Sequence, residues 1–141
     1  EYNCRFGDPE TQVVLPLLES DLLDVMTATT NGTLADTEVK FSDKSACCVV
    51  MASEGYPKSY ETGFEITLPS NPDGEIYIAG AKKDGARLVT SGGRVLGATA
   101  VGDTLKCAVD KAYALADSIK FGNSYCRRDI GKRALDAKGD F

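Results

Sequence analysis

The feature that most constrains the fold of this sequence is a helical pattern of apolar residues between positions 105 and 119. The apolar side chains recur at steps of three and four residues, at Leu105, Ala108, Val109, Ala112, Leu115, Ala116 and Ile119. This spacing predicts one long helix with a single apolar face. Gly102, Asp103 and Thr104 precede the pattern and provide a helix start with a capping side chain. Such a helix is expected to cover a sheet.

Short strand patterns surround this helix. Residues 45–53 are apolar with paired valines, which predicts a buried central strand. Further strands are expected at residues 39–41, 64–68, 75–81, 87–90, 94–101 and 121–127, with a polar turn at 82–85, a tight bend at 91–93 and a closing helix from Asp129 to residue 137. Hairpin connections and one long helix predict an α+β domain with a mostly antiparallel sheet.

The N-terminal quarter of the chain has helical signals. Residues 9–18 predict a short helix with Asp8 as its cap and Pro9 at its first position. A second helix is expected at residues 21–30, with Ser20 and Asp21 as candidate caps, and it is ended by the Asn-Gly pair that follows. Its apolar residues are expected to form one buried face, and they are Leu22, Leu23, Val25 and Met26.

The composition narrows the class of protein. The chain has 141 residues, 43% of them hydrophobic and 26% charged, which is typical of a soluble globular protein. The net charge of -5 argues against general binding of nucleic acid. No apolar run approaches the roughly 20 residues that span a bilayer, so we expect no membrane segment.

The cysteines give no sign of a metal site or a disulfide framework. There are 5 of them, and no histidine. No Cys-x-x-Cys pair occurs, so a structural zinc site is not expected. Cys47 and Cys48 lie in an apolar run and are interpreted as core thiols, because no histidine is present to activate them. Reduced thiols indicate the cytoplasm.

The first six residues alternate like a strand, with Glu1, Asn3 and Arg5 on one face. Glu1 and Asn3 are about 6.6 Å apart along such a strand. Their oxygens can then converge on a hard cation such as Mg²⁺. Arg5 offers a planar fork for phosphate or carboxylate oxygens. The plainer alternative is an exposed strand face with an ion pair.

These residues carry a family resemblance. The pattern Glu-x-Asn-x-Arg resembles the metal-binding strand of the ATP-grasp ligases. Residues 5–12, Arg-Phe-Gly-Asp-Pro-Glu-Thr-Gln, resemble the signature of the phosphoribosylamine–glycine ligase family. Three later segments resemble that family in the same order: Ala-Ser-Glu-Gly-Tyr-Pro at 52–57, Thr-Ser-Gly-Gly-Arg-Val at 90–95 and Tyr-Cys-Arg-Arg-Asp-Ile-Gly at 125–131. One departure is Ile78, where the family often has histidine.

The resemblance implies a domain division and an activity. Residues 1–32 would end an ATP-grasp domain, and residues 33–141 would form the family's C-terminal domain. The parent enzyme would be a cytoplasmic ATP-dependent carboxylate–amine ligase of purine biosynthesis that uses Mg²⁺ or Mn²⁺. It would join glycine to 5-phosphoribosylamine through glycyl phosphate. Its partners would include the preceding N-terminal and ATP-grasp regions, and without them this chain is expected to be inactive.

The resemblance also implies roles for single residues. Glu1 and Asn3 would bind the metal, and Arg5 would steady the transferred phosphoryl group or the acyl phosphate. Contacts with substrate would come from Gly92, Gly93, Arg94, Arg127 and Asp129, and the last two could instead contact the N-terminal part of the parent enzyme. Each has a plainer interpretation. The glycines would form a tight bend, Arg127 and Asp129 a charged turn with a capping aspartate, and Asp8 a helix cap.

Two other functions are consistent with these patterns. One is a non-catalytic binding or assembly module that kept the fold. The other is a different ATP-grasp ligase, such as a carboxylase, although the signature at residues 5–12 argues against it.

Overall fold

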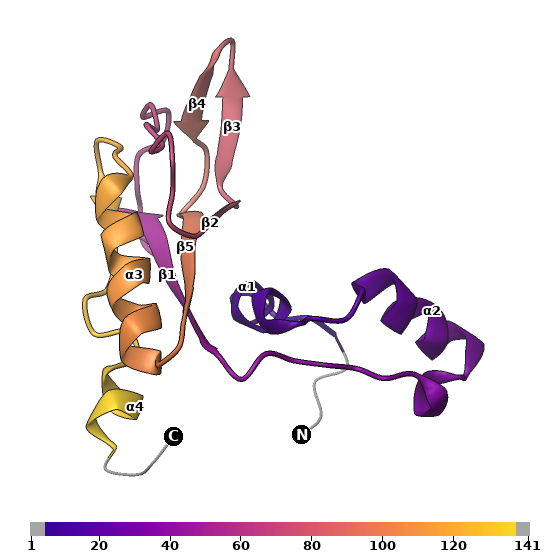
Figure 1. The fold of residues 1–141 in the computed structure, drawn as a ribbon. Coiled ribbons are helices and arrows are strands. Elements are labelled where there is room, and N and C mark those ends of the chain that lie inside the picture. Colours follow the sequence, from indigo (N-terminus) through magenta and orange to yellow (C-terminus); the bar gives the residue numbers. More distant parts are fainter. Residues whose placement is uncertain (1–4, 138–141) are drawn as a thin grey trace.

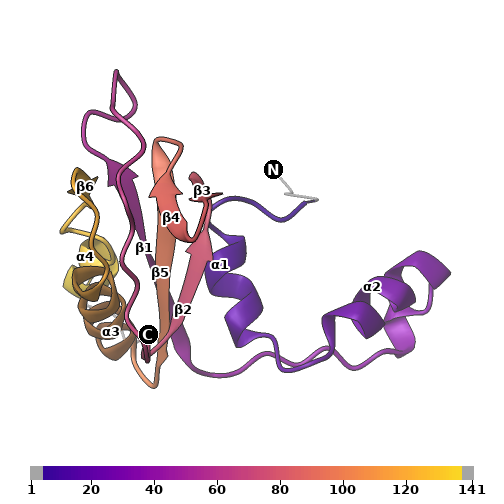
Figure 2. The same ribbon diagram turned by 90° about the horizontal axis from the view of Figure 1, so that it is seen from above.

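The protein is built around an antiparallel sheet with helices on both faces. The computed structural model describes residues 5–137 of the chain. The sheet has the strand order β2-β5-β1-β6, made of β2 (Glu75–Ile78), β5 (Arg94–Gly102), β1 (Ser45–Ser53) and β6 (Ser124–Tyr125). The long helix α3 (Leu105–Ser118) covers one face, and the short helix α1 (Thr11–Val14) lies on the other (Figures 1 and 2). The expected α+β class is confirmed.

The central pair of strands runs in register for most of its length. Ser45 pairs with Gly102, and Met51 pairs with Leu96. The register then shifts, so that Ala52 pairs with Arg94. Bulges of this kind re-aim neighbouring side chains, and this one lies beside Arg94.

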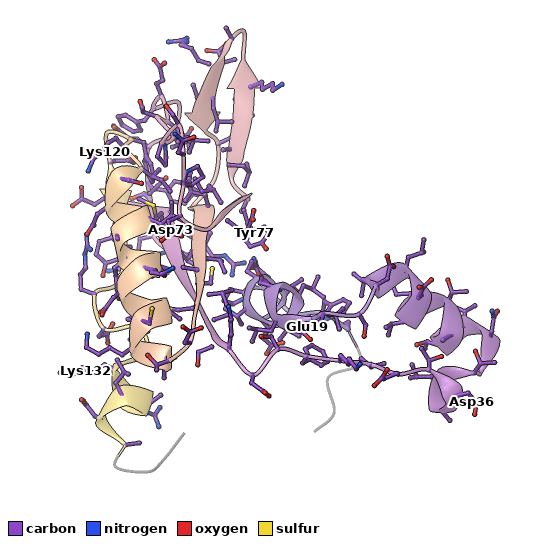
Figure 3. All side chains as sticks on the ribbon, viewed as in Figure 1. Glu19, Asp36, Asp73, Tyr77, Lys120 and Lys132 are labelled. Carbon is purple, nitrogen blue, oxygen red and sulfur yellow. The ribbon has the colours of Figure 1, made fainter. Side chains whose placement is uncertain are left out.

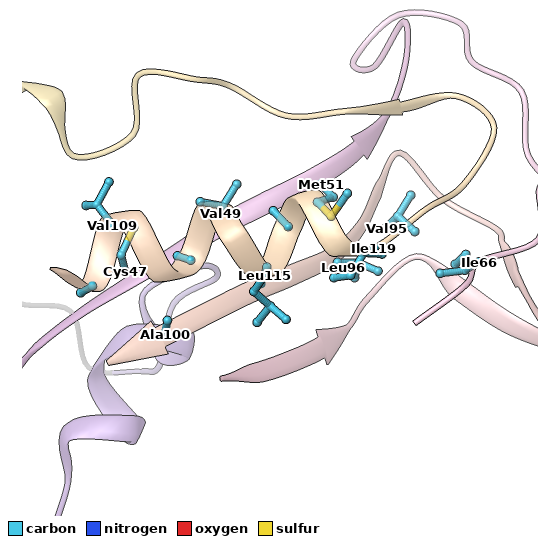
Figure 4. Packing of buried hydrophobic residues seen from close by; sticks show 14 of the residues in the cluster. Cys47, Val49, Met51, Ile66, Val95, Leu96, Ala100, Val109, Leu115 and Ile119 are labelled. Atoms are coloured by element: carbon cyan, nitrogen blue, oxygen red, sulfur yellow. The ribbon is translucent and has the colours of Figure 1, made fainter. Parts of the chain in front are cut away.

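The core lies between the sheet and α3, as the helical pattern predicted. Figure 4 shows the apolar side chains of α3 above β1 and β5. Its buried residues are Ala108, Val109, Ala112, Leu115 and Ala116, and they pack on Cys47, Val49, Met51, Leu96, Ala98 and Ala100. Thr104 caps the helix, because its Oγ1 accepts a hydrogen bond from the Cys107 N–H at 3.2 Å.

A two-stranded hairpin, β3 (Ala81–Asp84) with β4 (Arg87–Thr90), extends beyond the main sheet. The sequence predicted a turn at 82–85, which is wrong, because β3 continues to Asp84 and the turn contains Gly85 in the left-handed region. The chain leaves the main sheet at Gly80, where a Cβ would come 2.8 Å from the Gly92 Cα. Only residues without side chains allow the two segments to cross this closely.

Three predicted strands are much shorter than expected. Residues 39–41 and 64–68 contribute only isolated bridges, and 121–127 reduces to β6. The 64–68 segment shows the reason. Glu65 bridges to Val89 of the hairpin, while Thr67 bridges to Lys120 after α3. Because the partner changes within two residues, no continuous ladder forms.

The N-terminal helices differ from the prediction in extent. The chain forms α1, then the 3₁₀ turn η1 (Leu15–Leu17), helix α2 (Leu22–Asn31) and a second 3₁₀ turn, η2 (Leu34–Asp36). Helix α1 begins at Thr11, and no side chain caps it. Asp8 therefore does not cap this helix. Asp21 does cap α2, since it accepts from the Leu23 and Asp24 N–H groups at 2.8 and 3.2 Å.

Helix α2 stands away from the sheet (Figure 2), and its predicted buried face is wrong. Leu23 is 72% exposed and Met26 54%. Within α2 only Ala28 is buried, because no other described element covers the apolar side. No helix within residues 5–137 combines the length and apolar character that crossing a membrane requires.

Candidate functional site

The N-terminal segment meets the sheet at an ion pair between Asp8 and Arg94. The Asp8 Oδ2 lies 3.0 Å from the Arg94 Nη2. The other carboxylate oxygen, Oδ1, accepts a hydrogen bond from the Gln12 Nε2 at 3.0 Å. The pair is partly open to solvent, since the two side chains are 56% and 46% exposed. Asp8 thus joins the segment before α1 to the start of β5.

A hollow lies beside this pair, and we refer to it as the Asp8 hollow. It has a volume of about 420 Å³, and its polar walls come from Arg5, Asp8, Gln12 and Tyr77. A smaller space of about 40 Å³ adjoins it and reaches Arg94. Both are lined by residues of β2 and of the N-terminal segment around α1. Arg5 and the Asp8 carboxylate thus line the hollow, while Arg94 reaches only the smaller space beside it.

Gln12 contributes an acceptor without a partner. Its Oε1 is buried and makes no hydrogen bond among the described residues. The orientation of the amide is fixed, because turning it would place Oε1 against the Asp8 carboxylate. An unsatisfied buried acceptor costs about 1 to 3 kcal/mol. The Gln12 Oε1 is thus one of the buried acceptors that the described residues leave unsatisfied.

Tyr77 adds a hydroxyl group to the hollow. It pairs with Gly97 in the sheet, and Figure 3 shows it at the end of β2. Burial, and secondarily the neighbouring Glu75 and Cys48, raise the pKa of this phenol. The hydroxyl therefore keeps its proton at neutral pH and can donate a hydrogen bond.

The nearby thiol is not a nucleophile. Burial raises the pKa of Cys48, the neighbouring Thr99 hydroxyl acts in the opposite direction, and Asp8 raises the pKa further. A thiol with a raised pKa carries little thiolate at neutral pH. The interpretation of Cys47 and Cys48 as unreactive thiols agrees with their surroundings.

The predicted glycine bend is closely packed. A Cβ on Gly93 would collide with the Tyr56 ring. Ser53 holds the bend from β1, since its Oγ donates to the Gly92 carbonyl at 3.1 Å and its N–H donates to the Gly93 carbonyl at 2.8 Å. The bend thereby fixes where Arg94 begins β5. Contact of the two glycines with a substrate stays a prediction.

Arg127 and Asp129 lie elsewhere. They form a bidentate pair with N–O distances of 2.9 and 2.7 Å, which lowers the pKa of Asp129. The Tyr113 hydroxyl on α3 donates to the Arg127 carbonyl at 2.8 Å and accepts from the Ile130 N–H at 3.0 Å. This places the segment against α3, whereas Arg94 pairs with Asp8 in the segment before α1.

The predicted cap of the closing helix is wrong. Helix α4 (Lys132–Asp136) begins after Gly131, and no side chain caps it. The Asp129 carboxylate is directed to Arg127 instead. A strong charge-assisted pair takes the oxygens that a cap would need.

The predicted metal ligands, Glu1 and Asn3, lie outside the described residues, as does most of the predicted first strand. Arg5 is described and lies in irregular, exposed backbone, with its Nη1 donating to the Phe6 carbonyl at 3.2 Å. From residue 5 to residue 137, no three acidic or cysteine side chains gather closely enough to hold a metal ion.

Sequence reasoning missed Gln12 and Tyr77, and it gave Asp8 the wrong role. A signal was present for two of them. Asp8 and Gln12 are four residues apart, a spacing that brings side chains together across one helical turn. Tyr77 carried no comparable signal, because its position depends on the pairing of β2 with β5.

Comparison with known proteins identifies the family. Residues 46–133 match the family described as phosphoribosylglycinamide synthetase, C domain. The chain belongs to this family. It is 52% identical over 139 residues to phosphoribosylamine–glycine ligase of Chlorobaculum tepidum, a match that covers 96% of this chain and 33% of that protein. It is also 50% identical to a bifunctional purine biosynthetic protein of Pichia angusta, covering 98% of this chain and 18% of the other.

A solved structure supports the same assignment. Phosphoribosylamine–glycine ligase from Thermotoga maritima has a TM-score of 0.74 and 38% identity, with 92% of this chain and 32% of that chain covered. The chain therefore spans about a third of the length of the ligases that it matches. What it contains is the C-terminal domain of the family together with the segment that carries the Asp8 hollow.

Proposed function

We propose that the full-length protein carrying this chain is a ligase that joins glycine to 5-phosphoribosylamine with ATP, in the cytoplasm and as a step of purine biosynthesis. The observation that carries the proposal is the 52% identity to a phosphoribosylamine–glycine ligase across 96% of this chain. The products would be glycinamide ribonucleotide, ADP and phosphate. Further support comes from residues 5–12, where the resemblance to the ligase signature includes two residues of the hollow, Asp8 and Gln12.

The chemistry requires activation of a carboxylate. A carboxylate oxygen of glycine attacks the γ-phosphorus of ATP, which forms glycyl phosphate and releases ADP. The amine of phosphoribosylamine then attacks the carbonyl carbon, and phosphate leaves with its pair of electrons as the amide forms. Charge accumulates on the transferred phosphoryl group, so such a site needs cationic groups held in place.

The residues of this chain supply one wall of that site. Glu1 and Asn3 are the proposed oxygen ligands of Mg²⁺ or Mn²⁺, which would neutralise charge on the phosphates when bound. Arg5 is proposed to steady the phosphoryl group, and its position on the Asp8 hollow supports this role. Gly92, Gly93 and Arg94 are proposed contacts of the substrate.

Arg127 and Asp129 have a less direct proposed role. They were predicted to contact either the substrate or the rest of the protein. Their mutual pair beside α3 favours contact with the rest of the protein.

Residues 1–32 are proposed to complete an ATP-grasp domain that precedes this chain in the full-length protein. The exposed apolar residues of α2 support this division, because a soluble domain seldom leaves a row of large apolar side chains uncovered. Phe6, Leu23 and Met26 are each more than half exposed. The bulk of the nucleotide pocket would then belong to the preceding region, and the 141-residue chain alone would be inactive.

The test measures ADP formation by the full-length protein with Mg·ATP, glycine and phosphoribosylamine. We expect turnover only when all three substrates are present, and at least a hundredfold loss in the Glu1→Gln variant. The isolated chain serves as the matched negative control. ADP formation that does not depend on glycine would contradict the proposal, and a complete lack of turnover would favour the non-catalytic module.

A further inference from the structure

We propose that Asn31 is a modification site at which the chain deamidates spontaneously, and that the last turn of helix α2 controls the rate. The reaction closes a ring between the Asn31 side chain and the backbone nitrogen of Gly32. Water is the only co-reactant, so the proposal does not depend on the ligase activity. The sequence predicted the Asn-Gly pair only as the end of a helix.

The reaction exchanges the side-chain amide for a carboxylate. The Gly32 nitrogen gives its proton to water and attacks the Asn31 Cγ with its electron pair. The bond from Cγ to Nδ2 breaks, and ammonia leaves with a proton taken from water, which completes a succinimide ring. Water then opens the ring at either of its carbonyl carbons, so that position 31 becomes an aspartyl or an isoaspartyl residue.

The residue after the asparagine decides whether the ring closes without a clash. Glycine has no side chain to hinder the approach of its nitrogen. Gly32 has a φ of 72° in the left-handed region, and a Cβ there would meet nothing within 4 Å. Asn31 and Gly32 are both exposed, so water reaches both reacting groups.

The other asparagines in the described part of the chain lack these properties. Asn71 precedes Pro72, whose nitrogen carries no hydrogen. Asn123 precedes a serine, and its Nδ2 donates to the Glu61 carbonyl at 3.1 Å while its Oδ1 is buried. Between residues 5 and 137, Asn31 is therefore the asparagine that is both exposed and followed by glycine.

Two aspartates also precede glycine, but both are held in ion pairs. The Asp73 Oδ2 lies 3.3 Å from the Lys111 Nζ, and the Asp84 Oδ2 lies 2.8 Å from the Arg87 Nη2. An ionised carboxylate resists attack by a nucleophile, whereas the amide of Asn31 is neutral. Asn31 should therefore react before either aspartate.

The folded end of α2 opposes the reaction. The Gly32 N–H is directed at the Ala28 and Thr29 carbonyls, with its nitrogen 3.3 Å from the Thr29 oxygen. The Thr33 N–H donates to the Ala28 carbonyl at 2.9 Å. These bonds form a left-handed glycine cap, and they must open before the Gly32 nitrogen can turn toward the Asn31 side chain.

The last turn of α2 opens at low cost. Within this helix only Ala28 is buried. Segments with few buried apolar contacts open locally at a much lower free energy than the whole domain. Opening of this turn, and not unfolding of the core under α3, therefore limits the reaction.

The product weakens the helix that protected it. A carboxylate at position 31 lies at the C-terminal end of α2, where the helix dipole is already negative. In the isoaspartyl product the main chain gains one carbon atom, which displaces the Gly32 N–H from its acceptors. The modified chain should therefore lose the cap of α2.

The test incubates the 141-residue chain at neutral pH and follows its peptides by mass spectrometry. Exchange of NH₂ for OH raises the mass of a peptide, and chromatography separates the aspartyl from the isoaspartyl product. We expect the peptide with Asn31 to gain mass while the peptide with Asn123 stays unchanged. Urea that unfolds the chain should accelerate the reaction at Asn31 by about tenfold or more, because α2 is then open all the time.

Two matched variants isolate the contribution of the helix. Asp21→Ala removes the cap at the other end of α2, which weakens the helix without touching the reacting groups. It should raise the rate at Asn31 several-fold in the folded chain and leave the rate in urea unchanged. Thr104→Ala removes the corresponding cap of α3 and should leave the rate at Asn31 unchanged.

Gly32→Ala tests ring closure itself. In urea, where the helix is absent, the added methyl group should slow the reaction at Asn31 by hindering the approach of the nitrogen. An equal rate in this variant and the wild type would overturn the proposed ring closure.

The proposal as a whole is overturned if the folded chain keeps the Asn31 amide over a period in which the urea-unfolded chain loses it. Equal rates in the wild type and Asp21→Ala would also overturn it, because the helix would then not control the reaction. These outcomes are independent of the ligase activity of the full-length protein.

Discussion

At the scale of single residues, Gly93 sets how closely the bend after β4 approaches the loop after β1. The Tyr56 ring occupies the space where a Cβ on Gly93 would be. Tyr56 in turn meets Tyr60 edge to face, with ring centroids 6.0 Å apart. The bend therefore holds Arg94 at a fixed place next to Asp8 through backbone packing.

Gly93→Ala is expected to lower the free energy of unfolding by about 1 to 3 kcal/mol, because overpacking forces neighbouring groups to move. Urea denaturation of the chain measures the loss. The control is the same substitution in a Tyr56→Ala background, where the ring is absent and the loss should fall well below 1 kcal/mol. An equal loss in both backgrounds would show that the ring is not the cause.

Ionisation of the buried Cys47 thiol makes the free energy of unfolding depend on pH. Burial, with a smaller contribution from Cys48, raises its pKa from 9.0 to about 11 in the folded protein. The unfolded chain ionises this thiol at the lower pKa. The contribution of Cys47 to the free energy of unfolding is therefore fully present below pH 9 and is lost as the pH rises through 11. The expected loss is about 2 to 3 kcal/mol.

Urea denaturation between pH 8 and pH 11 measures this decline. Tyrosines and lysines also titrate in that range, so the comparison is with Cys47→Ala, whose stability should fall less steeply. Parallel pH profiles of the two proteins would contradict the assignment of the effect to Cys47.

Asp8 shows why the candidate site was only partly predictable. An aspartate before proline and glutamate has every local property of a helix cap. Its actual partner, Arg94, lies far along the chain at the start of β5, and no local rule pairs these two positions. Arg94 was singled out as a substrate contact only because its motif resembles the ligase family, and that contact stays a prediction.

At the scale of elements, α2 has an apolar face in its sequence that no described part of this chain covers. Its pattern calls for a covered apolar face, yet Leu23 and Met26 are exposed. A hollow of about 530 Å³ runs along this face beside Phe6, Leu22 and Val25. This is the surface expected to contact the preceding domain.

The double substitution Leu23→Lys with Met26→Lys tests that contact. In the 141-residue chain it should change the free energy of unfolding by less than about 0.5 kcal/mol, because exposed positions tolerate charge. In the full-length protein the same change should lower the melting temperature by several degrees, since two charges would be buried without partners. The matched control is Asp24→Lys on the same helix, which should have little effect in either protein.

An unchanged melting temperature of the double variant in the full-length protein would contradict the proposed domain contact. The measurement is differential scanning calorimetry of both proteins with each variant.

Elements with one strongly buried face were the best predicted. Helix α3 and strands β1 and β5 lie nearly where their patterns indicated, because burial of one helix face and of a whole strand dominates their energetics. The strands predicted at 64–68 and 121–127 are mostly absent for the opposite reason. They alternate like strands, but their pairing depends on which neighbour the tertiary fold provides, and that neighbour changes every few residues.

At the scale of the whole molecule, the sheet joins a packed core to the N-terminal segment. Its α3 face carries the core that holds the domain together. Residues of β2 and the N-terminal segment form the Asp8 hollow. Strand β5 contributes Leu96 and Ala98 to the core and Arg94 to the ion pair with Asp8.

The central claim is that this chain belongs to a ligase that activates glycine as an acyl phosphate. The most direct measurement follows oxygen from glycine labelled with ¹⁸O in its carboxylate, using the full-length protein, ATP and phosphoribosylamine. Because phosphate leaves with the carboxylate oxygen that attacked ATP, mass spectrometry should find one ¹⁸O in each phosphate released. Unlabelled phosphate, with the label wholly retained in glycine or its product, would contradict the account.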